Sequence, residues 1–214
     1  MSKHPLRGLY CITDPKLLAQ SCFDIETMVR QAIAGGAQLI QYRDKSSSPP
    51  QQHEIASRLC EICQAHSVIF LVNDDPLLAK AVNAHGVHLG QTDTGLPMAR
   101  KILGEEKIIG ISCHDSLALA GQAQQQGADY VAFGRFFASQ TKPEARPAPI
   151  ALLAEAKAAL HIPIVAIGGI TVDNATELLL AGADMLAVIN HVFGQQDIQQ
   201  AAAKISRLFS PQRT

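Results

Sequence analysis

Long apolar runs, a basic excess and a leader-like N-terminus are all absent from this 214-residue chain. Its longest apolar runs, such as residues 68–72, are far too short to span a bilayer, which takes about 20 residues. Basic and acidic residues number 18 and 19, so the sequence lacks the positive excess that nucleic-acid binders usually carry. The first residues lead directly into a strand-like run, without a charged segment, an apolar core and a cleavage site. We therefore expect a cytoplasmic protein that binds neither membranes nor nucleic acids.

Charged residues are also scarce, at 17% of the chain, whereas hydrophobic residues make up 47%. This balance excludes a disordered chain and provides enough apolar side chains for a full core. The polar stretch at residues 46–50 is short enough to be one loop, and no long linker divides the chain. We expect a single domain over residues 1–214, and a homo-oligomer is compatible with the sequence.

Cysteines are few and odd in number: Cys11, Cys22, Cys60, Cys63 and Cys113. Without a leader, an odd count indicates reduced thiols. Cys60 and Cys63 form a lone CxxC pair, but a structural zinc site usually takes four ligands and no second pair follows. We therefore interpret the pair as one face of a helix, where residues i and i+3 are neighbours.

Short apolar runs alternate with longer helix-like stretches along the chain. The runs are mostly apolar throughout, which is typical of parallel strands covered on both faces. The eight expected strands are residues 8–12, 38–42, 68–72, 86–89, 107–111, 130–133, 163–167 and 185–189. The expected helices include residues 25–34, 52–65, 76–82, 117–126, 150–160, 171–181 and 198–208.

Strands that alternate with helices indicate βαβ units and a parallel sheet. Eight units over this length favour the α/β class and a compact (β/α)8 TIM barrel, with a doubly wound sheet as the alternative. Glycines recur where a helix leads into the next strand, at Gly35-Gly36, Gly127 and Gly182. Glycine there supplies the left-handed C-cap that ends a helix, so these repeats are structural.

Polar residues concentrate where the strands end. In a barrel, the functional site lies at the carboxyl ends of the strands, in the loops that lead to the helices. The polar positions that follow the strands are Thr13, Asp14, Gln41, Arg43, Asp44, Lys45, Asn73, Asp74, Asp75, Gln91, Thr92, Asp93, Ser112, His114, residues 134–142 and Asn190. A purely structural barrel would not need this one-sided distribution.

Several of the charged residues also have structural explanations. Asp14 and Asp75 each precede a proline and a helix-like run, which is typical of N-caps. Asp74 and Asp93, taken singly, are equally well explained as caps. Arg43 and Lys45 alternate at the mouth of an apolar strand, which favours both pointing toward the rim over two unrelated surface charges.

The histidines are mostly explained by structure. His88 lies inside an expected strand, where a hydrogen-bonded core residue is more typical than a ligand. His85 and His161 precede strands, at the end opposite the expected site. His114 follows a strand and its role is left open.

Two anion sites are indicated on the same rim. Arg43, Lys45 and Lys142 supply positive charge, and Asp74 with Asp93 supply two carboxylates from different strands, a mixture that suits a diphosphate bound with magnesium. Gly168-Gly169 and Asn190 follow the seventh and eighth strands, where barrels usually bind a monophosphate. The rim therefore suits two phosphorylated substrates, or one substrate with a phosphate at each end.

No nucleophile–base pair stands out on this rim. We therefore expect catalysis through electrostatic stabilisation of a departing diphosphate, assisted by the metal.

Six segments of the chain resemble the signatures of the thiamine phosphate synthase family. They are Tyr10-Cys-Ile-Thr-Asp14, Gln41-Tyr-Arg-Asp-Lys45, Val72-Asn-Asp74, Gly86-Val-His-Leu-Gly-Gln-Thr-Asp93, Ser139-Gln-Thr-Lys142 and Ile167-Gly-Gly-Ile-Thr171. The resemblance runs from residue 8 to about residue 195 and so covers nearly the whole chain. Some segments are short, but together they are highly specific.

The resemblance implies an enzyme that joins 4-amino-2-methyl-5-(diphosphooxymethyl)pyrimidine to a thiazole phosphate, giving thiamine phosphate and diphosphate. Diphosphate would leave first, a pyrimidine methylene cation would form, and the thiazole nitrogen would attack it. A carboxylated thiazole would also lose carbon dioxide. The implied partners are therefore small-molecule substrates, with Mg²⁺ as the cofactor.

The resemblance also implies the roles of individual residues. Gln41, Arg43, Lys45, Asn73, Ser112 and Lys142 would bind the pyrimidine diphosphate, with catalytic roles for Lys142, Arg43 and Ser112. Asp74 and Asp93 would hold Mg²⁺. Ser139, Thr141, Gly169, Ile189 and Asn190 would hold the thiazole phosphate.

The chain departs from the family pattern at two positions. His85 stands where many members have an acidic residue, but it precedes a strand and no catalytic effect is expected. Asn190 stands where many members have a serine, and its amide can still hydrogen-bond a phosphate.

Three other functions compete with the synthase. A thiazole tautomerase of the same barrel family would use a base such as His114, and would not need the two magnesium carboxylates with Lys142. A non-catalytic thiazole-phosphate sensor would be expected to show a degraded diphosphate site, and no such damage is visible. A phosphosugar-isomerising barrel would need a positioned acid and base in place of the metal site.

Overall fold

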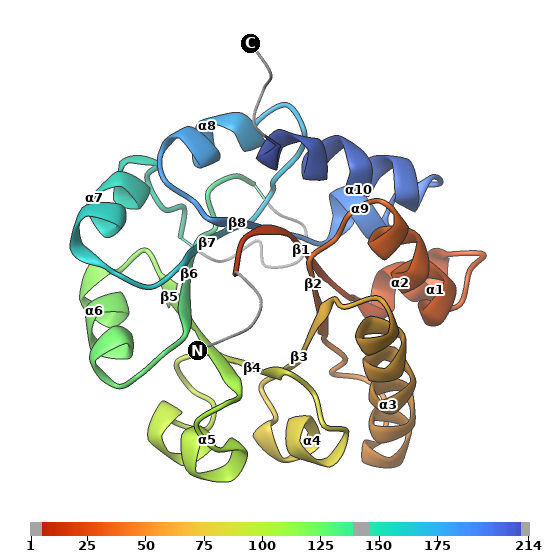
Figure 1. Ribbon diagram of the computed structural model, residues 1–214. Coiled ribbons are helices and arrows are strands. Elements are labelled where there is room, and N and C mark those ends of the chain that lie inside the picture. Colours follow the sequence, from red (N-terminus) through yellow and green to blue (C-terminus); the bar gives the residue numbers. More distant parts are fainter. Residues whose placement is uncertain (1–5, 139–145, 211–214) are drawn as a thin grey trace.

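The computed structural model describes residues 6–138 and 146–210, which form a closed barrel of eight parallel strands (Figure 1). Each strand pairs with the next in sequence, and β8 pairs with β1, so the doubly wound alternative is excluded. The strands are β1 (Gly8–Ile12), β2 (Leu39–Tyr42), β3 (Ile69–Asn73), β4 (Gly86–Leu89), β5 (Ile108–His114), β6 (Tyr130–Phe133), β7 (Ile164–Ile167) and β8 (Met185–Val188). The (β/α)8 TIM barrel and all eight expected strands are confirmed. The extent of one domain over residues 1–214 stays a prediction.

Helices form a ring outside the barrel in Figure 1. They are α1 (Pro15–Gln20), α2 (Ile25–Ala34), α3 (Pro49–Ala65), α4 (Pro76–Ala81), α5 (Leu96–Leu103), α6 (Leu117–Gln125), α7 (Ala151–Ala159), α8 (Ala175–Leu180), α9 (Asn190–Phe193), α10 (Ile198–Ser206) and the 3-10 turn η1 (Arg207–Phe209). Every helix expected from the sequence is present. The unexpected ones are α1, α5 and α9. Helix α1 buries none of its residues, and α9 has only four residues, too few to show a helical period. Helix α5 buries Leu96 and Ala99 on one face, so its pattern was present in the sequence and was overlooked.

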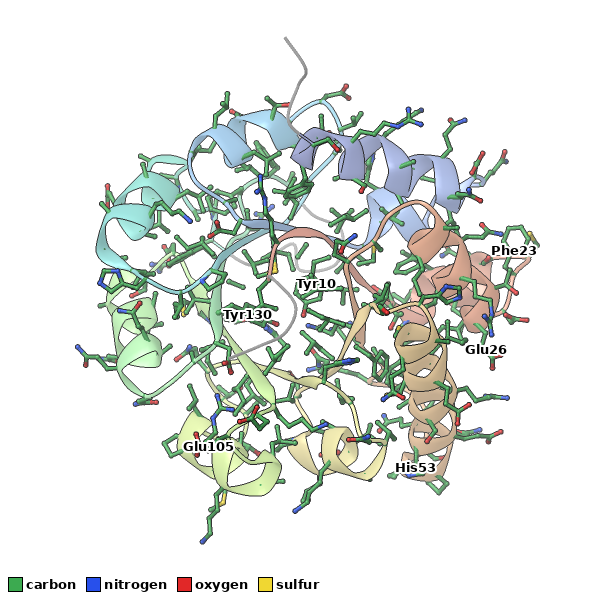
Figure 2. All side chains as sticks on the ribbon, viewed as in Figure 1. Tyr10, Phe23, Glu26, His53, Glu105 and Tyr130 are labelled. Carbon is green, nitrogen blue, oxygen red and sulfur yellow. The ribbon has the colours of Figure 1, made fainter. Side chains whose placement is uncertain are left out.

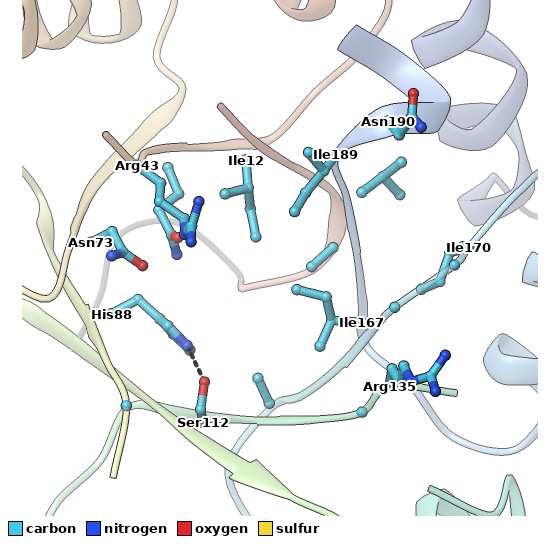
Figure 3. A pocket seen from close by; sticks show the side chains of 18 of the residues that line it. Ile12, Arg43, Asn73, His88, Ser112, Arg135, Ile167, Ile170, Ile189 and Asn190 are labelled. Atoms are coloured by element: carbon cyan, nitrogen blue, oxygen red, sulfur yellow. Dashed lines mark hydrogen bonds between the residues drawn. The ribbon is translucent and has the colours of Figure 1, made fainter. Parts of the chain in front are cut away.

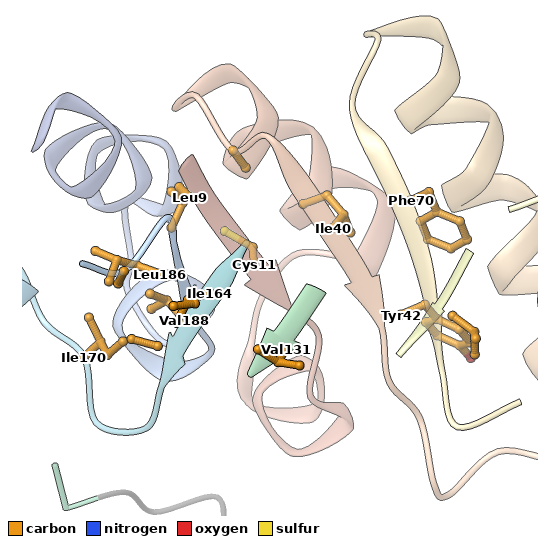
Figure 4. Close-up of a cluster of buried hydrophobic side chains, with 14 of the residues drawn as sticks. Leu9, Cys11, Ile40, Tyr42, Phe70, Val131, Ile164, Ile170, Leu186 and Val188 are labelled. Atoms are coloured by element: carbon orange, nitrogen blue, oxygen red, sulfur yellow. The ribbon is translucent and has the colours of Figure 1, made fainter. Parts of the chain in front are cut away.

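Apolar side chains fill both faces of the barrel wall. Leu9, Ile40 and Val131 point outward and pack beneath the helices (Figure 4). The neighbouring residues Tyr10 and Leu39 belong to a second buried cluster inside the barrel. Because successive side chains of a strand point to opposite faces, each strand is buried on both, which explains its continuous apolar sequence.

The barrel interior also contains polar side chains. Gln41 and His88 occupy inward positions with exposed fractions of only 2% and 9%. The rings of Tyr10 and Tyr130 lie inside the ring of strands in Figure 2. Among the described residues, no buried side-chain nitrogen or oxygen lacks a hydrogen-bond partner, so these groups do not carry an unpaired desolvation cost.

A glycine makes room for one of these rings. Gly110 lies between His88 and Tyr130 in the register of β4, β5 and β6. A Cβ atom at residue 110 would lie 1.9 Å from Cζ of Tyr130 and 2.4 Å from its hydroxyl oxygen. The tyrosine therefore occupies the space that any other residue at position 110 would fill.

The N-caps and helix-ending glycines expected from the sequence are confirmed. Asp14 and Asp75 cap α1 and α4 by accepting hydrogen bonds from backbone N–H groups. Gly127 and Gly182 have φ values of 89° and 113°, in the region that only glycine adopts readily. Both positions end helices as predicted.

Cys60 and Cys63 lie buried on α3, and the Sγ atom of Cys60 lies 3.6 Å from the carbonyl oxygen of Asn83. Within residues 6–138 and 146–210, no group of three or more histidine, cysteine or acidic residues is arranged to hold a metal. Because Cys60 and Cys63 are both buried on α3, the CxxC pair is part of a helix face, as expected. No helix in these same ranges has the length and apolar character to cross a membrane.

The close approach at Gly110 predicts an asymmetric effect of two glycine replacements. Gly110→Ala forces a methyl group into Tyr130 and should lower the free energy of unfolding by about 1–3 kcal/mol. Gly121→Ala, inside α6 with no atom within 4 Å of the new Cβ, should raise it by about 0.5–1 kcal/mol. Urea denaturation followed by circular dichroism measures both, and equal stability of the two variants would contradict the packing described.

Candidate active site

One cavity opens at the carboxyl ends of the strands. Its volume is about 610 Å³, within the range usual for small-molecule sites. It is lined by Gln41, Arg43, Lys45, Asn73, Asp74, Asp93, Ser112, Gly169, Ile189 and Asn190, so all the candidate residues that the structure describes meet in one place. The remaining candidates, Ser139, Thr141 and Lys142, lie outside the described residues.

The polar groups divide between two sides of the cavity (Figure 3). Arg43, Asn73 and His88 lie on one side. Arg135 and Asn190 lie on the other, with Ile189 and other apolar side chains between the two groups. The cavity therefore offers two polar regions joined by an apolar middle.

Two carboxylates and a lysine meet on the first side. Nζ of Lys45 lies 2.8 Å from Oδ2 of Asp74. Asp93 accepts a 2.7 Å hydrogen bond from the backbone N–H of Gly90. Neither Asp74 nor Asp93 caps a helix, since the N-cap of α4 is Asp75 and the N-cap of α5 is Gly95.

The two carboxylates influence each other's protonation. Burial and the nearby Asp74 raise the pKa of Asp93. Burial alone would also raise the pKa of Asp74, but hydrogen bonds with Lys45 and Asp93 outweigh it and the pKa is lowered. Negative charge on both groups at neutral pH is therefore costly, and a cation between them would relieve that cost.

The backbone holds these carboxylates at the rim. Asp74 follows β3 in a left-handed conformation, with φ of 63°, and its N–H donates to the carbonyl of His88 at 2.8 Å. A non-glycine residue with positive φ is uncommon and is often found at functional sites. Beside it, Asp44 accepts hydrogen bonds from the N–H groups of Ser46 and Ser47, which folds the loop after Lys45.

The oxygen donors of this region suit magnesium. Mg²⁺ is usually bound by one or two carboxylates and by substrate phosphate oxygens, while it keeps several waters. Asp74 and Asp93 supply such a pair without a third protein carboxylate. The residues present therefore fit this ion.

The second side of the cavity is formed by loops that pack closely. Gly168 and Gly169 have φ values of 104° and 64°. A Cβ atom on Gly169 would lie 2.3 Å from the carbonyl oxygen of Ala138, so only glycine fits. The side-chain amide of Asn174 donates to the carbonyl of Gly169 at 3.1 Å, which fixes this loop from its outer side.

Three residues of the cavity were not singled out as functional by the sequence. Arg135 follows β6 and adds a positive charge on the second side, which its place after a strand could have indicated. His191 accepts a hydrogen bond from the N–H of Val172, and burial lowers its pKa, so it serves as a neutral acceptor. Gln91 donates from its side chain to the carbonyl of Ser112 and so ties two loops together. His114 also lines the cavity, at the end of β5.

His88 is both a hydrogen-bonded core residue and a residue that lines the cavity. Its Nε2 atom lies 2.8 Å from Oγ of Ser112, and its Nδ1 atom lies 2.8 Å from the hydroxyl of Tyr130 (Figure 3 shows the first contact). It is a hydrogen-bonded core residue, as expected, but it also reaches the cavity.

Comparison with known proteins agrees with this geometry. A family model described as thiamine monophosphate synthase matches residues 9–192. The chain is 48% identical over 217 residues to the thiamine-phosphate synthase of Alcanivorax borkumensis, covering 100% of this chain and 99% of that one. It is 51% identical over 205 residues to the thiamine-phosphate synthase of Marinobacter nauticus, covering 95% and 91%. Among solved structures, thiamine phosphate pyrophosphorylase from Pyrococcus furiosus superposes with a TM-score of 0.86 at 36% identity, covering 94% of each chain.

The cost of two negative charges on Asp74 and Asp93 leads to a prediction for the binding of Mg²⁺. Because the pKa of Asp93 is raised, the stability it contributes in its protonated form is lost as pH rises through that pKa. Asp93→Asn should therefore fold at least as stably as the wild type at pH 7.5 without metal, yet gain less from added Mg²⁺. Thermal denaturation with and without 10 mM MgCl₂, a concentration of roughly the order needed to populate a weak site, measures both effects.

Glu105→Gln is the matched control, since it removes an exposed carboxylate outside the cavity. It should keep the wild-type response to Mg²⁺. An undiminished response in Asp93→Asn would contradict the assignment of the metal to this pair.

Proposed function

The chain belongs to the thiamine monophosphate synthase family, and from this premise we propose which substrates and which metal its cavity binds. Its activity is that of a thiamine-phosphate synthase, EC 2.5.1.3, as the sequence resemblance implied. We propose that it condenses 4-amino-2-methyl-5-(diphosphooxymethyl)pyrimidine with a thiazole phosphate to give thiamine phosphate and diphosphate. With a carboxylated thiazole, carbon dioxide is released as well.

The pyrimidine diphosphate binds on the side of the cavity that carries Arg43 and Lys45. Two cations and a carboxylate pair in one rim region support this assignment, because a diphosphate needs both positive charge and a bridging metal. Gln41, Asn73 and Ser112 line the same cavity and offer hydrogen bonds to the aminopyrimidine ring. Lys142 is assigned to the diphosphate by family resemblance.

Mg²⁺ is the cofactor, held by Asp74 and Asp93. When bound, it supplies Lewis-acid stabilisation of the negative charge that develops on the leaving diphosphate. Lys45, whose Nζ lies 2.8 Å from Oδ2 of Asp74, would turn to the diphosphate oxygens when the carboxylate is neutralised by the metal.

The thiazole phosphate binds on the opposite side. The close-packed glycine loop at Gly168-Gly169, the end of β8 at Ile189 and the amide of Asn190 support this assignment. Ser139 and Thr141 are assigned to it by family resemblance. Two anions at opposite ends would place the reacting atoms over the apolar middle, where Ile12 and Ile167 limit the access of water to a reactive cation.

Catalysis in this cavity depends on electrostatics and positioning. Arg43 and Lys45 neutralise charge on the leaving group, and the fixed loops orient the nucleophilic thiazole nitrogen. The departure of diphosphate needs no protein nucleophile. This agrees with a site in which the two carboxylates would bind the metal. The chemistry is that of a biosynthetic enzyme with small-molecule substrates, and we propose a cytoplasmic location for it.

The tautomerase alternative rests on His114 as a base. His114 lines the cavity, so the geometry allows that chemistry. The tautomerase alternative gives no role to Asp74 and Asp93. These two carboxylates and the neighbouring cations are the observation that supports the synthase assignment.

The direct test is a mixing assay. Purified protein is incubated with pyrimidine diphosphate, thiazole phosphate and Mg²⁺, with and without EDTA. We expect thiamine phosphate and diphosphate in equal amounts, and no product with the chelator. Product that forms undiminished with EDTA would exclude the metal, and no product from either thiazole form would exclude the substrates proposed.

Removing a metal carboxylate should abolish most turnover. Asp93→Ala, and likewise Lys142→Ala, should lower kcat by about 10²–10³, the typical cost of an electrostatic contact made to the transition state. Asp14→Ala is the control, since it removes an N-cap outside the cavity and should cost about 0.5–2 kcal/mol of stability but no turnover. Near-normal turnover in Asp93→Ala or Lys142→Ala would disprove the role of that residue.

A further inference from the structure

A continuous chain of hydrogen bonds crosses the barrel interior beneath the cavity. The side-chain amide of Gln41 donates to the hydroxyl of Tyr10, whose oxygen lies 3.0 Å from the hydroxyl oxygen of Tyr130. The hydroxyl of Tyr130 lies 2.8 Å from Nδ1 of His88, and Nε2 of His88 lies 2.8 Å from Oγ of Ser112. Both ends of the chain, Gln41 and Ser112, line the cavity, whereas the two tyrosines are fully buried.

The number of protons on each group determines which atom donates in each hydrogen bond of this chain. A tyrosine hydroxyl has one proton, and burial raises the pKa of both Tyr10 and Tyr130, so each stays protonated at neutral pH. Because Tyr10 accepts from Gln41, its own proton goes to Tyr130. Tyr130 then donates to Nδ1 of His88. With the Gln41 amide nitrogen donating to Tyr10, any other order would leave a buried donor without an acceptor, which is costly.

The same proton count determines whether Gln41 and Ser112 offer a donor or an acceptor to the cavity. Because Nδ1 accepts from Tyr130, the proton of the His88 ring lies on Nε2, which donates to Ser112. The hydroxyl proton of Ser112 is then available to the cavity, and so is the carbonyl oxygen of the Gln41 amide. One end of the chain offers a donor and the other an acceptor.

We propose that Tyr10, Tyr130 and His88 are positioning residues that couple the hydrogen-bonding polarity of Gln41 to that of Ser112. Reversal of one end requires reversal of every link, including a flip of the Gln41 amide and a change of the His88 tautomer. The site therefore presents an acceptor and a donor as a matched pair.

This pair suits an aminopyrimidine. Its exocyclic amino group is a donor and its ring nitrogen is an acceptor, so the Gln41 carbonyl and the Ser112 hydroxyl can satisfy both. The substrate class rests on the proposed function, in which both residues bind that ring. A ring with an oxo group and a protonated nitrogen would present the opposite pattern and require the whole chain to reverse.

The surrounding rings hold the chain in place. The His88 imidazole stacks on the ring of Tyr130, with centroids 5.5 Å apart and planes at 21°. Tyr10 meets Tyr130 edge to face at 6.2 Å. The missing side chain at Gly110 leaves the space that the Tyr130 hydroxyl occupies. Apolar residues would fill this interior without the polar links, so the observed tyrosines point to a role beyond packing.

Steady-state kinetics test the coupling through substrate binding. Tyr130→Phe removes one hydroxyl and keeps the ring, so it should raise KM for the pyrimidine diphosphate about tenfold with kcat nearly unchanged. Val131→Ala is the control, because it removes a buried side chain of the same strand that faces the helices. It should lower stability and leave KM unchanged. Unchanged KM in Tyr130→Phe, or an equal rise in both variants, would overturn the proposal.

NMR of ¹⁵N-labelled histidine tests the chain independently of activity. The wild type should show the Nε2–H tautomer of His88. In Gln41→Glu, at a pH where ¹³C NMR shows the introduced carboxyl to be ionised, that group can only accept from Tyr10. All links should then reverse, and His88 should change to the Nδ1–H tautomer.

Adding Tyr130→Phe to Gln41→Glu should abolish this change, because the chain is cut. If His88 keeps its Nε2–H tautomer in Gln41→Glu, or responds equally in the double variant, the coupling does not exist. A wild type that makes no thiamine phosphate would instead disprove the proposed function, and the tautomer measurement would still decide whether the chain is coupled.

Discussion

Closure of eight parallel strands into a barrel is the constraint on which the site depends. Parallel strands that close a ring send all their carboxyl ends to the same rim, so side chains far apart in the sequence meet there. Asp74 and Asp93 follow β3 and β4, and Gly168 follows β7. No interaction between neighbours in the sequence could bring such positions together, whereas closure of the barrel brings them to one cavity.

Closure also creates the interior that supports the cavity. Small residues, apolar residues and a few paired polar residues share this space, and polar groups are tolerated there only when each has a partner. The chain from Gln41 to Ser112 meets that requirement while it reaches the cavity at both ends. If Gln41 and Ser112 bind the substrate as proposed, the same hydrogen bonds contribute to stability and to substrate recognition.

Much of this arrangement follows from sequence because it is encoded locally. Continuous apolar runs predict the strands, since both faces of each strand are buried, and residues directly after a strand predict the rim. Helix α1 escapes detection because it buries none of its residues, and α9 because its four residues are too few to show a helical period. Arg135 is overlooked although it stands after a strand, because a single positive charge has no local pattern of its own.

The buried chain of hydrogen bonds from Gln41 to Ser112 could not be predicted from local sequence patterns. Tyr10 and Tyr130 are 120 residues apart and each lies in an apolar run, where a tyrosine reads as core. Only the three-dimensional register shows that β1 and β6 present both rings to the same interior, and that Gly110 leaves room between them. His88 was predicted to be a hydrogen-bonded core residue, but its partners Tyr130 and Ser112 were not.

In the proposed function, Asp74 and Asp93 would together hold the metal ion that the pyrimidine diphosphate needs. Anomalous diffraction from crystals grown with Mn²⁺ and the pyrimidine diphosphate, without the thiazole, tests this claim most directly. We expect one manganese peak in coordination contact with a carboxylate oxygen of each aspartate and with oxygens of the diphosphate. A peak that contacts neither aspartate, or diphosphate bound on the Gly168-Gly169 side, would contradict the account.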